Sequence, residues 1–335
     1  MKQCPLRLFD CSADWGRHAV VYNLQPVRLF FVMPWRNDTA WKGRPVVYTI
    51  HPDIRLGEVK LKVSNLKRSL EFYEQVVGLK ILKQTSVTAE MTVDGVHSLL
   101  SLEEIPNALV VPPRSASGLY HFAILVPTRK DLGVSLRRLI QSGISIGQAD
   151  HLVSEALYIS DPDHNGIEIY ADRPRDVWQR DADGNYRMAT DPIDWEGLLK
   201  EAESEVWSGL PKGTTIGHVH FHVGDLQQAG AFYCDLLGFE MAADYSRLMR
   251  ALFISAGGYH HHIGLNVWAG IGASPAPPHG TGLAYYTIMY PDASELETAL
   301  QRIRDAGVPL EEQEGAWIVS DPFGIRTRLT VIPSE

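Results

Sequence analysis

Hydrophobic and polar residues alternate with a period of two over residues 56–63 and again over residues 216–223. Alternation of this kind predicts β-strands that bury one face. After each stretch the apolar spacing changes to that of an amphipathic helix, and Ser64-Asn65 and Gly224-Asp225 stand where the helices are expected to start. The pattern therefore predicts a strand followed by a helix at two places in the chain.

These two places belong to an internal repeat with an offset of 216 − 56 = 160 residues. The matching positions are Gly57/Gly217, Val59/Val219, Val63/Val223, Leu66/Leu226, Phe72/Phe232, Tyr73/Tyr233 and Gly78/Gly238. The last glycine of each copy suits the left-handed backbone that commonly ends a helix. One strand-helix module is therefore used twice.

A second pair of matching segments begins at Gly118 and Gly282. Each is followed by a helical pattern, a glycine turn and an Asp-Pro dipeptide, at residues 161–162 and 321–322. The chain therefore contains four modules, each consisting of a strand, a helix and two or three further strands. This pattern predicts the α+β class, with four βαβββ modules arranged as two domains.

The modules set the expected domain boundaries. Residues 54–173 form the first domain and residues 214–333 the second, with two modules in each. Residues 174–213 form a polar linker, in which the apolar spacing from Trp195 to Val206 predicts a short amphipathic helix. Residues 1–53 show no sustained period and are an N-terminal extension, or else a strand or arm that packs on a neighbour.

Composition narrows the range of partners. The chain has 335 residues, 45% hydrophobic and 21% charged, and its formal charge of −9 disfavours binding to nucleic acid. No run approaches about 20 apolar residues and no secretory signal is seen, so a soluble protein without a membrane partner is expected. The three cysteines, Cys4, Cys11 and Cys234, lack CxxC spacing and fit a reducing cytoplasm.

Four phrases carry a family resemblance: GLYHFAI at residues 118–124, SEALY at 154–158, GIEIYAD at 166–172 and GGYHHHIGL at 257–265. The four modules, the strand-helix phrase that ends in Phe-Tyr-x-x-x-x-Gly and the Asp-Pro before the last strand resemble the vicinal oxygen chelate superfamily over roughly residues 55 to 332. Within that superfamily the four phrases together resemble the two-domain catechol 2,3-dioxygenases. The resemblance implies an iron(II)-dependent extradiol dioxygenase that opens the ring of catechol, or of a substituted catechol, with O2.

Members of this superfamily take metal ligands from the first and last strands of paired modules. The first-strand positions of the four modules hold Glu58, His121, His218 and Tyr285, and the last-strand positions of modules two and four hold Glu168 and Arg328. Modules two and three together thus imply His121, Glu168 and His218 as ligands. Two histidines and one carboxylate suit Fe(2+) and leave positions open for a catecholate and O2.

This ligand set requires module two to pair with module three, and the sequence leaves that pairing open. Sequential pairing of module one with module two would place Glu58 where His218 stands, a set closer to glyoxalase-like members. His220 and His222 share a strand face with His218. They are either hydrogen-bonded structural residues or partners of a ligand.

Extradiol cleavage also needs a base for the catechol proton and an acid for O–O cleavage, and histidine suits both tasks. The resemblance places one such histidine in the run 260–262, where His262 is preferred to His261 because it leads into a strand; an exposed cluster is the alternative. His151 and Tyr158 resemble the second histidine and the tyrosine that bind substrate oxygens. Tyr158 fits equally well as a core aromatic residue.

Two other functions are compatible with the same fold. A glyoxalase-like metal-dependent isomerase or lyase would share the ligand positions but need no dioxygen. A non-enzymatic small-molecule binder would lack metal ligands and use aromatic walls, for which Trp268, Tyr285 and Tyr286 are available. The fold does not choose among these functions, and the oligomeric state, a homo-oligomer included, stays open.

Overall fold

The computed structural model describes residues 48–333, which belong to one compact unit. Most of the expected extension, residues 1–53, therefore lies outside the described residues. The part that is described packs on the third module: Ile50 is fully buried, and its N–H donates to the carbonyl oxygen of Gly238 at 2.9 Å.

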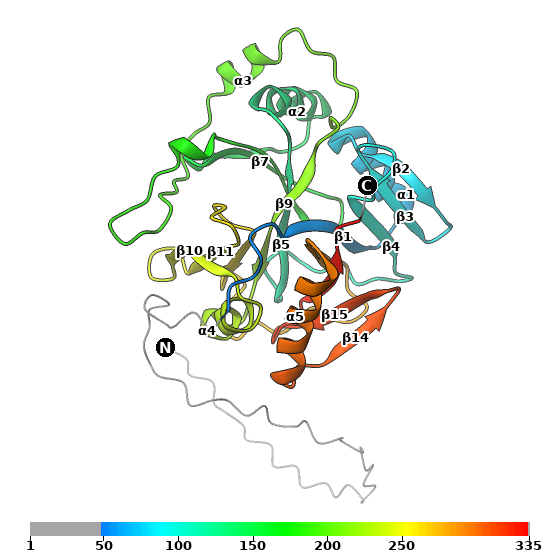
Figure 1. Ribbon diagram of the computed structural model, residues 1–335. Helices are drawn as coiled ribbons and strands as arrows, with labels where there is room; N and C mark the ends of the chain where they lie inside the picture. The colour runs from blue at the N-terminus through cyan, green and yellow to red at the C-terminus, as the bar shows by residue number, and fades with distance from the viewer. Residues whose placement is uncertain (1–47, 334–335) are drawn as a thin grey trace, which may run out of the picture. The chain divides into compact units, whose positions relative to one another are not determined.

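The observed elements follow the predicted modules (Figure 1). Module one contains β1 (Arg55–Val63), α1 (Leu66–Phe72), a π-helical turn η1 (Tyr73–Val77), β2 (Lys80–Gln84), β3 (Thr88–Thr92) and β4 (Leu100–Glu104). Module two contains β5 (Gly118–Leu125), α2 (Arg129–Ser142), β6 (Gly147–Asp150), β7 (Ser154–Ser160) and β8 (Gly166–Asp172). Each therefore has the order strand, helix and three strands.

The second half of the chain repeats this order. Module three contains β9 (Thr215–His222), α4 (Leu226–Gly230), a π-helical turn η3 (Ala231–Leu236), β10 (Glu240–Tyr245), β11 (Ala251–Ser255) and β12 (Ile263–Asn266). Module four contains β13 (Gly282–Tyr290), α5 (Ala293–Asp305), β14 (Leu310–Gln313), β15 (Ala316–Ser320) and β16 (Arg326–Val331). The predicted α+β class and four βαβββ modules are confirmed.

Local side-chain chemistry sets where the first helices begin and end. The Asn65 side chain accepts the N–H of Arg68, and the Asp225 side chain accepts the N–H of Gln228. The helices therefore start within the two predicted dipeptides, and in each it is the second residue that caps the helix. Gly78 follows the π-helical turn with φ of +99°, a left-handed conformation that favours glycine.

The strands form two eight-stranded sheets, and each sheet combines one module from the first half of the sequence with one from the second half. One sheet has the order β14-β15-β16-β13-β1-β4-β3-β2 and the other β10-β11-β12-β9-β5-β8-β7-β6. The central pairs, β1 with β13 and β5 with β9, are both antiparallel. Module two therefore pairs with module three and module one with module four, so the sequential pairing considered above does not form.

Each half of the sequence is nevertheless held together by a buried hydrogen bond. The Tyr73 hydroxyl donates to Asp161 at 2.9 Å, which joins module one to module two. The equivalent Tyr233 hydroxyl donates to Asp321 at 3.1 Å, which joins module three to module four. The repeat boundaries at residues 54–173 and 214–333 stay a prediction, because each sheet draws strands from both segments.

The segment between the repeats contains a short turn, η2 (Arg175–Val177), and the helix α3 (Trp195–Glu201), which packs on α2. The helix begins at the predicted residue but ends before the predicted Val206. The Arg137 guanidinium, on α2, donates to the carbonyl oxygens of Ala202 and Glu205, and the Ala202 carbonyl is one that a helix reaching Val206 would have used internally. A side chain from α2 thus limits the length of α3.

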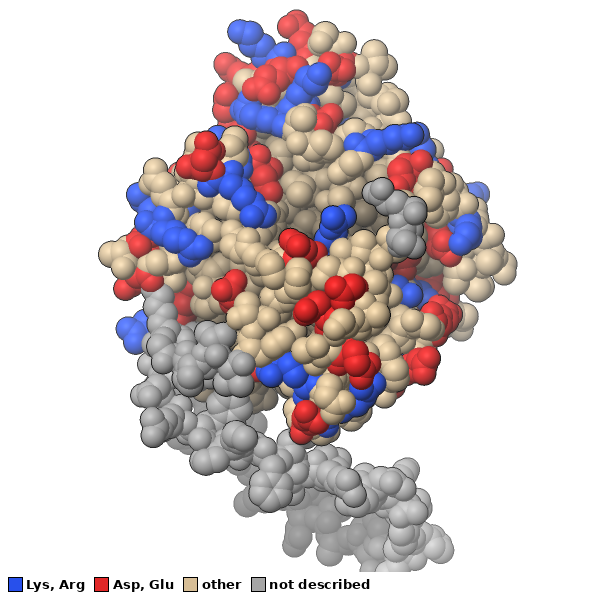
Figure 2. Space-filling view, in the orientation of Figure 1, with Lys and Arg blue, Asp and Glu red and all other residues tan. Residues whose placement is uncertain are grey.

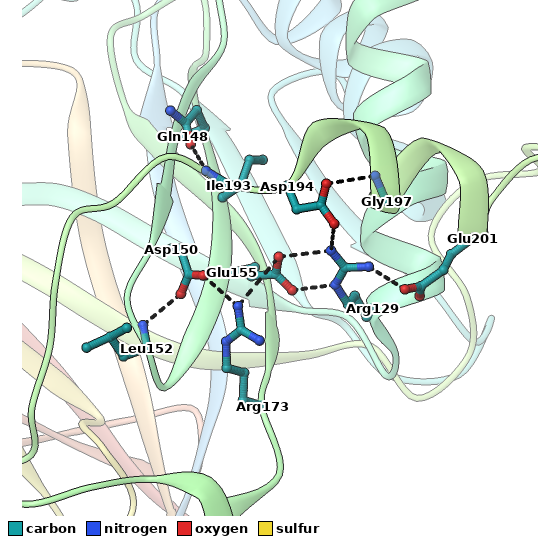
Figure 3. Close-up of polar contacts among 10 residues, drawn as sticks. All are labelled: Arg129, Gln148, Asp150, Leu152, Glu155, Arg173, Ile193, Asp194, Gly197 and Glu201. Carbon is teal, nitrogen blue, oxygen red and sulfur yellow. Dashed lines mark hydrogen bonds and ion pairs between the residues drawn. The ribbon is translucent and has the colours of Figure 1, made fainter.

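Ion pairs fix this connecting segment to module two (Figure 3). Arg129 contacts Glu155 at 2.6 Å and also contacts Asp194 and Glu201 of the connecting segment. Arg173 contacts Asp150 at 2.6 Å. Arg129 therefore joins Asp194 and Glu201 of the connecting segment to Glu155 of β7, which is only 2% exposed.

The surface shows charges of both signs. On the face drawn in Figure 2, Lys and Arg side chains are interspersed with Asp and Glu side chains. This face offers no extended basic surface of the kind that tracks a phosphate backbone. Among residues 48–333, no helix combines the length and apolar character needed to span a membrane.

Asp321 generates a prediction about stability. Burial raises the pKa of Asp321 from its ordinary value of 3.8 to about 6, although the N–H groups of Ile325 and Phe323 favour the ionised form. A folded-state pKa above the unfolded value means that this group stabilises the protein below about pH 4, and that the contribution is lost as pH rises through about 6.

Asp321→Asn should remove this part of the pH dependence. The difference in unfolding free energy, wild type minus variant, should fall by on the order of 2 kcal/mol between pH 4 and pH 6 and then level off. Urea denaturation at several pH values measures it. A difference that stays constant, or grows, across this range would contradict the assignment.

Candidate metal centre

Three neighbouring strands bring the predicted ligands together. β5 pairs in parallel with β8 so that Ala123 lies opposite Glu168, and it pairs antiparallel with β9 so that Ala123 also lies opposite His218. His121 stands two residues before Ala123 and so points from the same face of β5. The register of three strands therefore aims two imidazoles and one carboxylate at a common point.

The donor atoms of these residues are close and buried. His218 Nε2 lies 3.0 Å from Glu168 Oε2, His121 Nε2 lies 3.1 Å from the same oxygen, and the two Nε2 atoms are 3.3 Å apart. The residues are 1%, 2% and 5% exposed for His218, Glu168 and His121. Among the described residues, these three form the one His, Cys, Asp or Glu cluster whose ligand atoms are arranged to hold a metal ion.

The electrostatics favour the ionisation states that a metal needs. Burial opposes the charge on Glu168, but the two histidines outweigh burial and hold the pKa of this carboxyl well below its usual value. Burial lowers the pKa of His121, an effect that outweighs the contact with Glu168. An ionised carboxylate beside a neutral imidazole is the state in which both groups donate a lone pair to a cation.

Glu58, the alternative ligand, lies in the other sheet. Its carboxylate accepts hydrogen bonds from Ser101 Oγ at 2.7 Å and from the Tyr285 hydroxyl at 2.8 Å. It is absent from the cluster formed by His121, Glu168 and His218. The set with one histidine and two carboxylates is therefore not assembled in this fold.

His151 and Tyr158 form a hydrogen-bonded pair beside the cluster. His151 Nδ1 lies 2.7 Å from the carbonyl oxygen of Ala189, and Nε2 lies 2.6 Å from the Tyr158 hydroxyl. Since a carbonyl oxygen only accepts, Nδ1 carries the proton in the neutral ring, and the Tyr158 hydroxyl then donates to Nε2. The rings of Tyr158 and His121 are 5.6 Å apart, which places the phenol next to a candidate ligand.

Tyr158 keeps its proton in this environment. Burial raises the pKa of its phenol well above the usual value, and the negative charge of Glu168 acts in the same direction. The protonated Tyr158 phenol can therefore donate its hydrogen bond to His151. The signal that linked them was their spacing from Glu168, whereas Ala189 gave no signal in the sequence because only its backbone takes part.

The histidine run divides between two sides of the chain. The His261 ring packs on the His218 ring with centroids 4.1 Å apart, and it also contacts Phe253. His262 instead accepts the N–H of Ala256 through Nδ1, and it lines a different cavity. Of the two, His261 is the one whose ring packs directly on a candidate ligand, and the catalytic role of either histidine stays a prediction.

His260, Tyr259 and Tyr170 form a hydrogen-bonded group next to His218. His260 Nε2 lies 2.9 Å from Asp172, and Tyr259 donates to the same carboxylate at 2.9 Å. The Tyr259 and Tyr170 hydroxyls are 2.7 Å apart, and the Tyr170 ring lies 4.8 Å from the His218 ring. These contacts fix the His218 imidazole from one side.

The period of two did not reveal the position of Tyr120. Residues Tyr120 and His121 are adjacent, so a regular strand would point them to opposite faces. The pairing of β5 with β9 shifts register between Leu119 and His121, and an irregularity of this kind changes which side of the sheet neighbouring residues face. The Tyr120 ring thus lies 4.9 Å from His121 and 5.2 Å from His220.

His220 faces the same space as the candidate ligands. Its ring lies 5.1 Å from the His121 ring, and its Nε2 has no hydrogen-bond partner among the described residues. Burial lowers its pKa well below the usual value, which keeps the imidazole neutral. A side chain at Gly264 would meet the His220 ring at 2.7 Å, so this glycine makes room for it. The shared face with His218 was the sequence signal.

The chain is similar in sequence to two named dioxygenases. The chain is 56% identical over 274 residues to Catechol-2,3-dioxygenase of Bacillus subtilis (strain 168), covering 82% of this chain and 96% of that protein. It is 29% identical over 121 residues to Biphenyl-2,3-diol 1,2-dioxygenase 3 of Rhodococcus globerulus, covering 35% of this chain and 63% of that protein.

A solved structure from Bacillus subtilis subsp. subtilis str. 168, of a protein assigned as a dioxygenase, has a similar fold. It aligns with a TM-score of 0.57 and 12% identity over 85% of this chain and 87% of that chain. The model of the Glyoxalase/Bleomycin resistance protein/Dioxygenase superfamily matches residues 55–169 and 215–329, one copy on each half of the repeat. This chain therefore belongs to the Glyoxalase/Bleomycin resistance protein/Dioxygenase superfamily.

Proposed function

We propose that this protein is an iron(II)-dependent extradiol dioxygenase that opens the ring of catechol, or of a substituted catechol, with O2. The enzyme class follows from 56% identity to a catechol-2,3-dioxygenase along 82% of the chain. The observation that carries the mechanism is the convergence of His121, Glu168 and His218 on one buried point.

The donor triangle fits a divalent ion with several free positions. Ligands about 2.1 Å from an ion and at right angles to one another are about 3.0 Å apart. The three observed separations are 3.0, 3.1 and 3.3 Å. Two imidazoles and one carboxylate on one side of an ion are the ligand set of non-haem iron(II) oxygenases. When bound by His121, Glu168 and His218, iron(II) would supply the activation of the diol and dioxygen.

His151 and Tyr158 are placed to handle the diol oxygens. The Tyr158 hydroxyl donates to His151 Nε2, which carries no proton. The same hydroxyl can rotate and donate to a substrate oxygen instead. His151 can also take a proton from the diol, since Nδ1 stays fixed on the Ala189 carbonyl. The pair thus binds and orients the substrate and accepts a proton.

His261 is placed to transfer a proton on the other side of the cluster. Burial lowers its pKa well below the usual value, so the ring is neutral and has one free nitrogen. Its Nδ1 lies 2.7 Å from His260 Nδ1, and His260 contacts Asp172. This chain of contacts gives a proton a route from His261 toward the Asp172 carboxylate during ring opening.

Aromatic side chains flank the cluster on the side of His220 and His261. Tyr120 lies 5.3 Å from Trp268, and His220 lies 5.4 Å from the same indole. Phe253 contacts both His220 and His261. Flat apolar walls around a polar centre suit an aromatic ring and strengthen the electrostatic interactions inside.

The first test is ring opening itself. Protein loaded anaerobically with ferrous iron should turn catechol and air into a yellow ring-opened semialdehyde, and zinc-loaded protein should not. His218→Ala and Glu168→Gln should lose both the product and bound iron, because each removes a donor atom. Absorbance follows the product, and metal analysis after desalting follows the iron.

Glu58→Ala is the matched control, because Glu58 occupies the equivalent position in the other sheet. It should keep iron and activity. Activity that survives His218→Ala would exclude the proposed ligand set, and equal activity with zinc would point to an isomerase or lyase instead.

Adjacent histidines test the acid–base assignment. His261→Ala should keep iron but lose about 10²–10⁴-fold in kcat, the usual contribution of a positioned acid or base. His262→Ala removes a ring whose Nδ1 accepts the N–H of Ala256, and it should lose less than tenfold. Steady-state kinetics on iron-loaded protein measures both. The reverse order of effects would return the assignment to His262.

Tyr158→Phe tests the phenol without changing the ring. Loss of the hydroxyl should lower kcat/KM by about 10²-fold, the usual effect of removing one oriented hydrogen-bond donor. Tyr290→Phe is the control, because the Tyr290 hydroxyl is buried without a partner in the other sheet. An equal loss in both variants would show a general packing effect and contradict the role of Tyr158.

A further inference from the structure

A second cavity lies against the sheet built from modules one and four. Its volume is about 1200 Å³, and its lining includes Glu58, Tyr285 and Arg328. It is bounded on another side by Tyr259 and His262, which stand behind the metal centre. Small-molecule sites usually span about 300–1,000 Å³, so this space is large enough for a ligand.

The three polar residues occupy the positions that hold the candidate metal ligands in the other sheet. Arg328 lies opposite Thr287, as Glu168 lies opposite Ala123, and Tyr285 precedes Thr287 by two residues, as His121 precedes Ala123. Glu58 matches His218 at the repeat offset of 218 − 58 = 160 residues. The same backbone positions thus carry a carboxylate, a phenol and a guanidinium.

This donor set does not suit a divalent cation. A guanidinium stays protonated in proteins, so Arg328 repels a cation at this point. The two oxygens of Glu58 already accept hydrogen bonds from Ser101 and Tyr285, at 2.7 and 2.8 Å. The matched position therefore presents a carboxylate, Glu168, in one sheet and a positive charge, Arg328, in the other.

Among the described residues, Arg328 is one of three cations that line the cavity without an ion pair, with Arg55 and Arg175. Its guanidinium lies 6.0 Å from the centre of the Tyr285 ring, and it makes no hydrogen bond or ion pair with any residue between 48 and 333. Lys60, the other cation beside this ring, is paired with Glu103 at 2.8 Å. Glu314 also lines the cavity but lies beyond ion-pair distance of Arg328. A half-buried cation without a partner is best satisfied by an anionic ligand.

We propose that this cavity is a second, metal-free binding site for a small carboxylate with an apolar body. The Arg328 guanidinium offers the fork of donors that matches a carboxylate through two parallel hydrogen bonds. Leu56, Leu102 and Met289 line the same cavity and contribute apolar surface for the body of the ligand. The site stands independently of the metal chemistry proposed above.

Isothermal titration of benzoate into the iron-loaded, anaerobic protein tests the site. Wild type should bind benzoate, and benzamide, which has the same ring but no charge, should bind at least tenfold more weakly. Arg328→Gln should weaken benzoate binding at least tenfold. Arg326→Gln is the matched control and should bind as wild type does, because Arg326 lies on the same strand but is paired with Glu311.

His218→Ala separates this site from the metal centre. It should retain benzoate binding if the carboxylate lies at Arg328. Loss of binding in His218→Ala together with normal binding in Arg328→Gln would place benzoate at the metal centre and overturn the proposal. Absence of benzoate binding in wild type, or binding that Arg328→Gln leaves unchanged, would overturn it as well.

A second variant guards against a folding defect. Thr330 lies two residues after Arg328 on the same face of β16 and also lines the cavity. Thr330→Glu would supply a carboxylate inside the chain and should weaken benzoate binding at least tenfold while Arg328 stays in place. Unchanged benzoate binding in this variant, with circular dichroism confirming its fold, would contradict the site.

Discussion

The antiparallel pairing of β5 with β9 is the contact on which the candidate site depends. It sets Ala123 opposite His218, while β8 on the other side of β5 sets Ala123 opposite Glu168. The three donors lie 97 and 50 residues apart along the chain, counted from His218 to His121 and from His218 to Glu168. A shift by one residue in either register would turn a donor to the other face of the sheet.

The cluster also depends on how burial acts on histidine. Burial lowers the pKa of His121, His220 and His261, so these rings remain neutral although they lie close together. Several charged imidazoles in a low-dielectric space would repel one another and lose their hydration. Neutral rings instead leave free lone pairs, which can hold a cation or accept a proton. Burial of these histidines therefore keeps their lone pairs available for a cation or a proton.

The two sheets show how one backbone arrangement supports different chemistry. Both place three polar side chains at equivalent positions, yet one set forms the candidate metal cluster and the other includes a guanidinium without an ion pair among the described residues. Fold alone thus says little about what each cavity binds. Arg328 stands at the position that Glu168 holds in the other sheet, so the two sites present opposite charges there.

The sequence by itself determined the modules, their order and the positions from which ligands project. Period-two alternation, the caps at Asn65 and Asp225, and the repeat are local signals, because they depend on residues a few positions apart. They were enough to name His121, Glu168 and His218 as ligands, once a family resemblance had indicated which strand positions to inspect. Tyr158 and His151 were named in the same way.

Only the tertiary structure decided which modules pair, because strands far apart in the sequence carry nearly the same alternation and could satisfy several partners. It also decided that His261 and not His262 faces His218, since the turn before β12 is irregular and a period of two does not extend through it. The register shift that brings Tyr120 beside His121 is likewise a property of two paired strands. Such features arise from packing between distant segments, which local periodicity does not encode.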